Sequence, residues 1–150
     1  MKRVLVDTNI FLYAIGGPHA YAEPCRRIIA LAGEGSVELE APVDLVQEIL
    51  HHRARRLGDR RQAASEATAA ASLCRLHAVE PRDMDTAAEL FAGSQRLSAR
   101  DAVFAAVAIR HDLAAILSAD GDFDELDDLR RLDPADARTL SDLTGATPPE

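Results

Sequence analysis

The stretch Arg3-Val4-Leu5-Val6-Asp7-Thr8-Asn9 decides the fold of this chain. Residues 3–6 form a short run, rich in valine, which is typical of a strand buried on both faces of a parallel sheet. The run ends abruptly at Asp7. Three good capping residues, 7–9, are followed by the apolar segment 10–15, which predicts a helix. A buried strand that passes directly into a helix indicates an α/β protein.

The rest of the chain alternates between strand-like and helix-like segments. We predict further strands near residues 37–41, 76–79, 114–117 and 131–132, and further helices near 19–31, 42–58, 60–73, 83–91 and 99–110. Pro42 is expected to open its helix, and Pro81 to end the strand before it. The run 102–109 is apolar on all sides, so the last helix should be central. This alternation predicts a parallel sheet covered on both faces, with its site at the carboxyl ends of the strands.

Composition sets the broad class of protein. The chain has 150 residues, enough for one domain, with 47% apolar and 28% charged residues, as in a globular protein. The net charge of −8 argues against a nucleic-acid binder that works by broad phosphate neutralisation. Two tyrosines, four phenylalanines and no tryptophan argue against a base-stacking platform.

Scarce residue types exclude several kinds of site. Lys2 is the sole lysine, which excludes P-loop, Schiff-base and receiver-type chemistry. Cys25 and Cys74 lie far apart, so they form no structural zinc site, and nothing suggests an oxidising compartment. With no signal-peptide core and no apolar stretch of about 18 residues, we expect a cytoplasmic protein that does not contact a membrane.

Acidic residues stand where the site of such a sheet should be. Asp7 follows the first strand, and Asp120 and Asp122 follow the fourth. Asp101 lies in the first turn of helix 99–110, and Glu48 lies about 60° outside the apolar stripe of Leu45, Val46, Ile49 and Leu50. If the first and fourth strands are neighbours, these acids open into one crevice.

Each acid also has a structural interpretation. Asp7 is a good N-cap, Asp101 fits a capping box with Ser98, and Glu48 fits a solvated helix edge. The acids after the fourth strand fit a turn. Taken together, however, converging carboxylates repel one another and raise one another's pKa unless a cation compensates them. Oxygen ligands without cysteine favour Mg²⁺ or Mn²⁺.

Two other acidic motifs are excluded. The segment 120–124 is similar to the start of an EF-hand loop, but Glu125 replaces the required glycine and Arg131 replaces the final glutamate. A haloacid-dehalogenase-type phosphatase would need an aspartate where Asn9 stands.

The ordered motifs resemble those of one known family. Val6-Asp7-Thr8-Asn9, Glu48 within 46–50, Arg100-Asp101-Ala102 and the S-x-D-x-D-F segment 118–123 are similar to the PIN-domain nucleases, in particular the VapC-type toxins of bacterial type II toxin–antitoxin systems. The resemblance covers about residues 3–133. It implies a PIN-like three-layer α/β/α sandwich with a central, mostly parallel sheet of four to five strands. We expect a PIN domain over 1–135 and a polar C-terminal tail over 136–150.

The resemblance also implies the activity. It predicts a Mg²⁺-dependent endoribonuclease, with Mn²⁺ as a possible substitute, that cleaves RNA by metal-activated water and leaves 5′-phosphate and 3′-hydroxyl ends. The catalytic acids would be Asp7, Glu48, Asp101 and Asp120, all of them metal ligands together with Asp122. Thr8, Asn9 and Ser118 are expected to orient Asp7 through hydrogen bonds. Ser118 stands where the family often has threonine.

Partners follow from the same resemblance. It implies a homodimer and a cognate VapB-type antitoxin whose segment fills the crevice and often places an arginine near the acids. Residues 10–13 contribute either to that groove or to the core. Two other functions stay open: a non-catalytic PIN-like RNA-binding or scaffold module, and a housekeeping RNA-processing nuclease.

The negative charge is unevenly distributed along the chain. Residues 120–128 hold six acids and no base, whereas residues 51–61 hold five arginines and one aspartate, a local charge of +4. We predict that these arginines contact RNA phosphates, although a solvated helix face fits each one singly: Arg53, Arg55, Arg56, Arg60 and Arg61. His51 and His52 are expected at the rim rather than as ligands.

Overall fold

The computed structural model describes residues 2–146. Its strands are β1 (Lys2–Val6), β2 (Val37–Pro42), β3 (Cys74–His77), β4 (Ala115–Leu117) and β5 (Arg130–Leu132). Its helices are α1 (Thr8–Ile15), α2 (Ala22–Gly33), α3 (Asp44–Leu57), α4 (Arg60–Ser72), α5 (Pro81–Gly93), α6 (Ala99–Arg110) and α7 (Ala137–Thr144), with a short 3-10 helix η1 (Gly121–Glu125).

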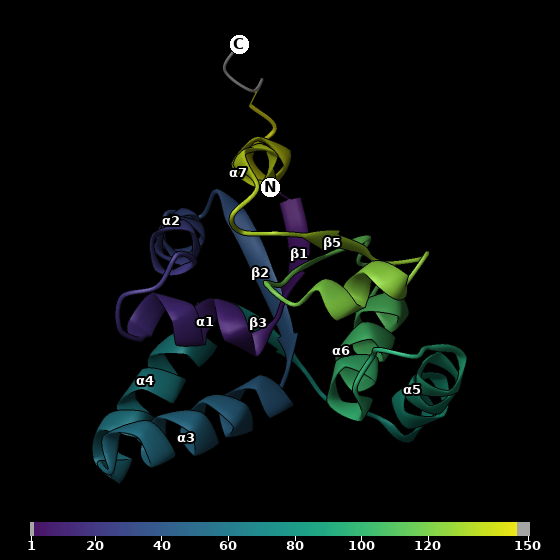
Figure 1. Cartoon of the computed structure of the whole chain (residues 1–150), viewed down its shortest axis with the longest axis horizontal. Helices are drawn as coiled ribbons and strands as arrows, with labels where there is room; N and C mark the ends of the chain where they lie inside the picture. The colour runs from purple at the N-terminus through teal and green to yellow at the C-terminus, as the bar shows by residue number, and fades with distance from the viewer. Residues whose placement is uncertain (1, 147–150) are drawn as a thin grey trace.

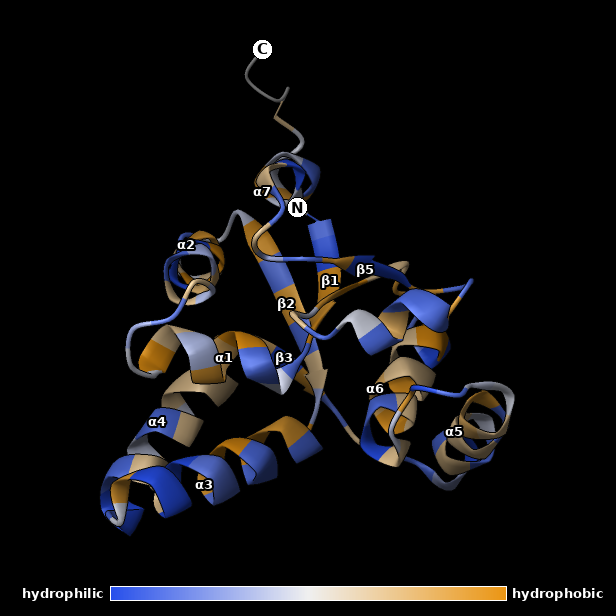
Figure 2. Cartoon of the chain, in the orientation of Figure 1, coloured by the Kyte–Doolittle hydropathy of each residue, from blue (hydrophilic) through white to orange (hydrophobic). Residues whose placement is uncertain are grey.

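The five strands form one parallel sheet in the order β3-β2-β1-β4-β5. Helices α1 to α4 lie on one side of the strands, and α5 and α6 lie on the other (Figure 1). In Figure 2, hydrophobic residues gather in β1, in β2 and in the core side of the helices, whereas the junction of α3 and α4 is strongly hydrophilic. The predicted three-layer α/β/α sandwich is therefore confirmed.

Strand β1 lies at the centre of the sheet. Val4, Leu5 and Val6 are completely buried, as their apolar run predicted. Val6 pairs with Leu117 of β4, and the backbone N–H of Asp7 continues the ladder by donating to the Leu117 carbonyl at 2.9 Å. The chain leaves β1 toward β2 on one side, while β4 lies on the other. The carboxyl ends of β1 and β4 thus form a topological switch point, where sheets of this type bind ligands.

Helix α6 is the apolar helix that the sequence predicted, with the same bounds. Residues 104–108 are buried, so the helix packs between the sheet and α5. At its start the Ser98 hydroxyl accepts a hydrogen bond from the Asp101 backbone N–H at 3.1 Å. The cap fixes the first turn of α6, and Asp101 lies there with 2% of its surface exposed.

Both proline predictions were wrong. Pro42 is the last residue of β2, a position that needs no further ladder donor, and α3 begins two residues later. Pro81 opens α5 rather than ending β3, because Glu80 and Asp83 form a capping box around it. The buried apolar stripe of α3 is also narrower than predicted, since Leu50 is 38% exposed.

The region expected to be a polar tail contains α7. Asp136 caps this helix, the Thr139 hydroxyl donates to the Asp133 carbonyl at 2.6 Å, and Leu143 is 2% exposed within the hydrophobic core. Leu140, which is partly buried, packs against the same core, so α7 docks through a narrow apolar stripe. Residues 147–150 of the expected tail lie outside the described residues. Among the helices of residues 2–146, none is long and apolar enough to cross a membrane.

Candidate active site

Asp7 stands at the carboxyl end of β1 with its carboxylate completely buried. Oδ1 accepts from the backbone N–H of Thr8 at 2.7 Å and from Arg100 at 3.0 Å. Oδ2 accepts from the Ser118 hydroxyl at 2.7 Å and from the Asn9 amide at 3.0 Å. Burial raises the pKa of Asp7 to about 6, although Arg100 and Ser118 oppose the shift. Asp7 is therefore both the cap of α1 and a buried carboxylate whose ionised form the fold disfavours.

Ser118 joins the first and last motifs of the chain. Its hydroxyl donates to Asp7 and accepts from the Asn9 amide at 3.1 Å and from the Asp120 backbone N–H at 3.0 Å. The Asn9 carbonyl oxygen in turn accepts from the Ala119 backbone N–H at 3.3 Å. These contacts fix the orientation of Asp7 across the junction of β1 and β4, which is the arrangement expected for Asn9 and Ser118.

Thr8 acts on a second acid. Its backbone N–H bonds to Asp7, but its hydroxyl donates to Glu48 Oε2 on α3 at 2.5 Å. Burial raises the pKa of Glu48, against the hydrogen bond from Thr8 and the charge of Arg100. Thr8 thus links β1 to α3 and turns Glu48 toward Asp7.

Arg100 is a site residue to which the sequence analysis gave no role. Its Nη2 lies 3.0 Å from Asp7 Oδ1 and 2.9 Å from Asp101 Oδ1, and its Nη1 lies 2.5 Å from Glu48 Oε2. The guanidinium also lies 5.4 Å from the Phe104 ring centre, within cation–π range. Three carboxylates from three elements therefore converge on one cation. The sequence contained a signal for this role, because Arg100 directly precedes Asp101 and converging acids require a compensating positive charge.

Asp120 and Asp122, the acids that follow β4, have other partners than Arg100. Asp120 caps η1 by accepting from the Asp122 backbone N–H at 2.9 Å, and its own N–H bonds to Ser118. Asp122 forms an ion pair with Arg96 at 2.8 Å. The structure therefore connects Asp120 to Asp7 through the Ser118 hydroxyl, while Asp122 is engaged by another arginine.

The predicted basic residues divide into two kinds. Arg53 is 8% exposed and forms an ion pair with Glu66 of α4 at 2.6 Å, so it fastens α3 to α4. The other four are exposed, and within residues 2–146 none forms an ion pair shorter than 4.0 Å: Arg55, Arg56, Arg60 and Arg61. These four arginines lie at the hydrophilic junction of α3 and α4 (Figure 2).

Comparison with known proteins gives a consistent result. The PIN domain family model matches residues 4–129. Ribonuclease VapC7 of Mycobacterium tuberculosis is 32% identical over 148 residues, which covers 95% of this chain and 98% of that protein.

Two solved structures share the fold. The Mycobacterium tuberculosis toxin VapC20, described as cleaving the sarcin–ricin loop, has a TM-score of 0.66 at 22% identity, over 81% of this chain and 93% of that one. VapBC2 from Rickettsia felis, bound to a DNA fragment of its promoter, has a TM-score of 0.65 at 17% identity, over 89% of this chain and 100% of that one. The fold, the match to the family model and the full-length similarity agree: this chain is a PIN-domain protein of the VapC ribonuclease family.

Proposed function

We propose that this protein is a VapC-type toxin, a metal-dependent endoribonuclease that a cognate antitoxin neutralises. The observation that carries the proposal is the convergence of Asp7, Glu48 and Asp101 on one guanidinium at the switch point of the sheet. Buried like charges of this kind are costly to a fold and are characteristic of sites that use them. The relative with 32% identity is named a ribonuclease.

The side chains of the site fit a hard divalent cation, Mg²⁺ or Mn²⁺. All the candidate ligands are carboxylates: Asp7, Glu48, Asp101, Asp120 and Asp122. Among residues 2–146, no three or more His, Cys, Asp or Glu side chains are arranged to hold a metal ion while Arg100 occupies the space between the acids. A bound ion would supply an activated water and compensate charge on the scissile phosphate.

The protein's own contribution is to hold the acids in place. Ser118 and Asn9 fix Asp7, Thr8 fixes Glu48, and the Ser98 cap fixes the turn that carries Asp101. Such supporting hydrogen bonds orient carboxylates and set their basicity. Arg100, with 40% of its side chain exposed, can exchange a carboxylate for a phosphate oxygen of the substrate.

The RNA backbone would lie along the junction of α3 and α4. Glu48 begins one end of this surface, and the exposed arginines Arg55, Arg56, Arg60 and Arg61 follow on the same pair of helices. Arg53 is not part of this surface, because Glu66 neutralises it. Each phosphate contact should make binding weaker at high salt.

The expected partners are a VapB-type antitoxin and a second copy of this chain. The Rickettsia felis relative was solved as a VapBC complex, which supports the first. The homodimer, the cytoplasmic location and the division into a domain of residues 1–135 and a tail stay predictions. The intact set of acids disfavours a non-catalytic RNA-binding or scaffold module.

Asp7→Asn tests the proposal. The substitution keeps the shape of the side chain but removes its charge, so we expect Mg²⁺- or Mn²⁺-dependent RNA cleavage to fall at least about 100-fold. The matched control is Asp85→Asn, which neutralises an exposed aspartate of α5. Mapping of RNA ends should find 5′-phosphates with the wild type and the control alone. Equal cleavage by wild type and Asp7→Asn would exclude this site.

A further inference from the structure

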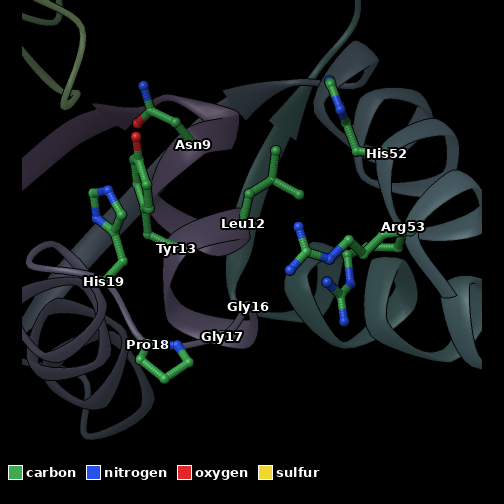
Figure 3. A pocket seen from close by; sticks show the side chains of 10 residues that line it. Asn9, Leu12, Tyr13, Gly16, Gly17, Pro18, His19, His52 and Arg53 are labelled. Carbon is green, nitrogen blue, oxygen red and sulfur yellow. The ribbon is translucent and has the colours of Figure 1, made fainter.

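A cavity of about 410 Å³ opens beside the acids, between α1 with its following loop on one side and α3 on the other. Figure 3 shows Tyr13 and His19 on the first wall, His52 and Arg53 on the second, and Leu12 between them. Ile10 and Phe11 are buried in the core, so of residues 10–13 it is Leu12 and Tyr13 that reach this cavity.

The two rings of the first wall, Tyr13 and His19, pack together with the ring of Tyr21, which lies behind the lining. The Tyr13 ring centre lies 4.5 Å from that of His19 and 5.2 Å from that of Tyr21, and the His19 and Tyr21 planes are inclined by only 13°. The His19 ring is fixed, since its Nδ1 accepts from the Tyr21 backbone N–H at 3.1 Å. The Tyr21 hydroxyl donates to Asp133 at 3.2 Å. His19 itself is exposed, so this aromatic cluster is accessible at the cavity.

The charge of the cavity is positive. Its lining holds Arg53, Arg56, His19 and His52 but no aspartate or glutamate. Glu66 neutralises Arg53, whereas Arg56 is exposed without an ion pair among the described residues. A basic antitoxin segment would find no carboxylate here, whereas a phosphate would find Arg56. Stacked rings beside an arginine are the combination with which proteins bind single-stranded nucleic acid.

Asn9 connects the cavity to the acids. Asn9 lines it, and the same Asn9 amide donates to Asp7 at 3.0 Å and to Ser118 at 3.1 Å. A nucleotide held in the cavity would therefore lie close to a scissile phosphate that a metal ion would hold at the acids. Unpaired bases enter such a pocket more readily than paired ones, because a paired base must first break its pairing and stacking.

We propose that this cavity binds one unpaired nucleotide of the RNA substrate, next to the cleaved bond, with its base stacked on His19 and Tyr13 and its phosphate on Arg56. The proposal rests on the ribonuclease function proposed above and adds a preference for single-stranded RNA. It runs against the expectation, drawn from the few aromatic residues, that the chain has no base-stacking platform, because the fold brings both tyrosines of the chain to one histidine.

The test measures binding separately from cleavage. The probe is a ten-nucleotide single-stranded RNA with one 2-aminopurine, whose fluorescence falls on stacking, and Asp7→Asn is introduced throughout to prevent cleavage. His19→Ala and Tyr13→Leu each remove one ring of the stack, and His19→Phe keeps a ring. Phe91→Ala is the matched control, because it removes a 51% exposed ring from α5. A second probe carries an abasic site in place of the 2-aminopurine.

We expect His19→Ala and Tyr13→Leu to raise the Kd of the RNA about 5- to 20-fold and to abolish the quenching, while His19→Phe and Phe91→Ala stay within about twofold. The increase in Kd caused by His19→Ala and Tyr13→Leu should vanish with the abasic probe, which has no base to stack. Arg56→Gln should reduce the slope of log K against log salt concentration by about one released counterion, whereas Arg75→Gln, which removes an arginine outside the cavity lining, should leave the slope unchanged.

Wild-type affinity in His19→Ala and Tyr13→Leu, or an equal loss with the abasic probe, would overturn the proposal. So would variants that bind RNA normally but escape the antitoxin, since the cavity would then be a peptide site. Absence of metal-dependent cleavage by the protein with Asp7 intact would refute the proposed function instead, and the two failures are thus distinguishable.

Discussion

Two clusters in which buried carboxylates bind arginines differ in the number of positively charged or hydrogen-bonding partners that each carboxylate has. At the candidate active site Arg100 is shared among Asp7, Glu48 and Asp101. Across the sheet strands, the single carboxylate of Glu40 accepts from Arg3 at 2.5 Å and from His77 at 2.5 Å. Asp7 and Glu40 are both completely buried.

The pKa values of the two carboxyl groups move in opposite directions. Burial raises both, but at Glu40 the hydrogen bonds from Arg3 and His77 outweigh burial and lower the pKa. At Asp7 burial prevails over Arg100, and the pKa rises to about 6. The Glu40 cluster has enough donors for its acid, whereas the active site has more acids than its single arginine can compensate. We therefore expect the first cluster to stabilise the fold and the second to accept a further cation, as proposed above.

Breaking the Glu40 cluster should have the largest effect. Glu40→Gln leaves Arg3 and the buried His77 without their carboxylate, so we expect the free energy of unfolding to fall by about 3 kcal/mol. Urea unfolding at pH 7 measures it. The control is Glu38→Gln on the same strand, whose partner Arg75 is exposed and 3.8 Å away, and which should cost under about 1 kcal/mol. An equal fall in the free energy of unfolding in Glu40→Gln and Glu38→Gln would show that the Glu40 cluster does not stabilise the fold more than an exposed ion pair.

The same isosteric change at Asp7 should have the opposite sign. Since the fold favours the neutral form of Asp7, Asp7→Asn should raise the free energy of unfolding at pH 7 by up to about 3 kcal/mol in EDTA, because the rise of the pKa from 3.8 to about 6 counts about 1.4 kcal/mol per pKa unit. Thermal and urea unfolding both report it. If Asp7→Asn proves less stable than the wild type, Arg100 compensates the charge of Asp7 fully, and the proposed difference between the Glu40 cluster and the Asp7 site is wrong.

Removal of the Ser118 hydroxyl should reduce activity more than stability. Ser118→Ala deletes the donor that holds Asp7 Oδ2, and we expect RNA cleavage to fall about tenfold. Ser118→Thr keeps the hydroxyl and should retain most of the rate. Steady-state cleavage of one RNA at saturating Mg²⁺ compares the three proteins, and a loss of rate in Ser118→Thr as large as in Ser118→Ala would exclude this role.

A pH series gives the smallest expected effect. An acid whose pKa is raised in the fold stabilises it at low pH, and that contribution is lost as the pH rises through about 6. The stability gap between Asp7→Asn and wild type in EDTA should thus narrow by about 1 kcal/mol from pH 7 to pH 5. His111, whose pKa burial lowers, acts in the opposite direction in both proteins and cancels in the difference. A constant gap would show that Asp7 titrates normally.

Much of the fold follows from local patterns in the sequence. The strand at residues 4–6 and the helix 99–110 were predicted because residues 4–6 and 104–108 are buried without interruption, and an unbroken apolar run shows this in the sequence. The errors lie where one residue has two uses. Pro42 and Pro81 each fit a strand end or a helix start, and the choice depends on the neighbouring strand and on the capping side chains. Helix α7 was missed because it docks through few apolar residues.

By itself, the sequence determined the order of the motifs, the class of fold and the candidate acids of the site, because periodicity and residue type are local properties. Only the tertiary structure decided that Thr8 turns to Glu48, that Arg53 is neutralised, that Arg100 stands among three carboxylates, and that Tyr13 and Tyr21 meet His19. These contacts join residues on different elements. The energies that select them, burial and charge compensation, depend on positions that the complete sheet creates.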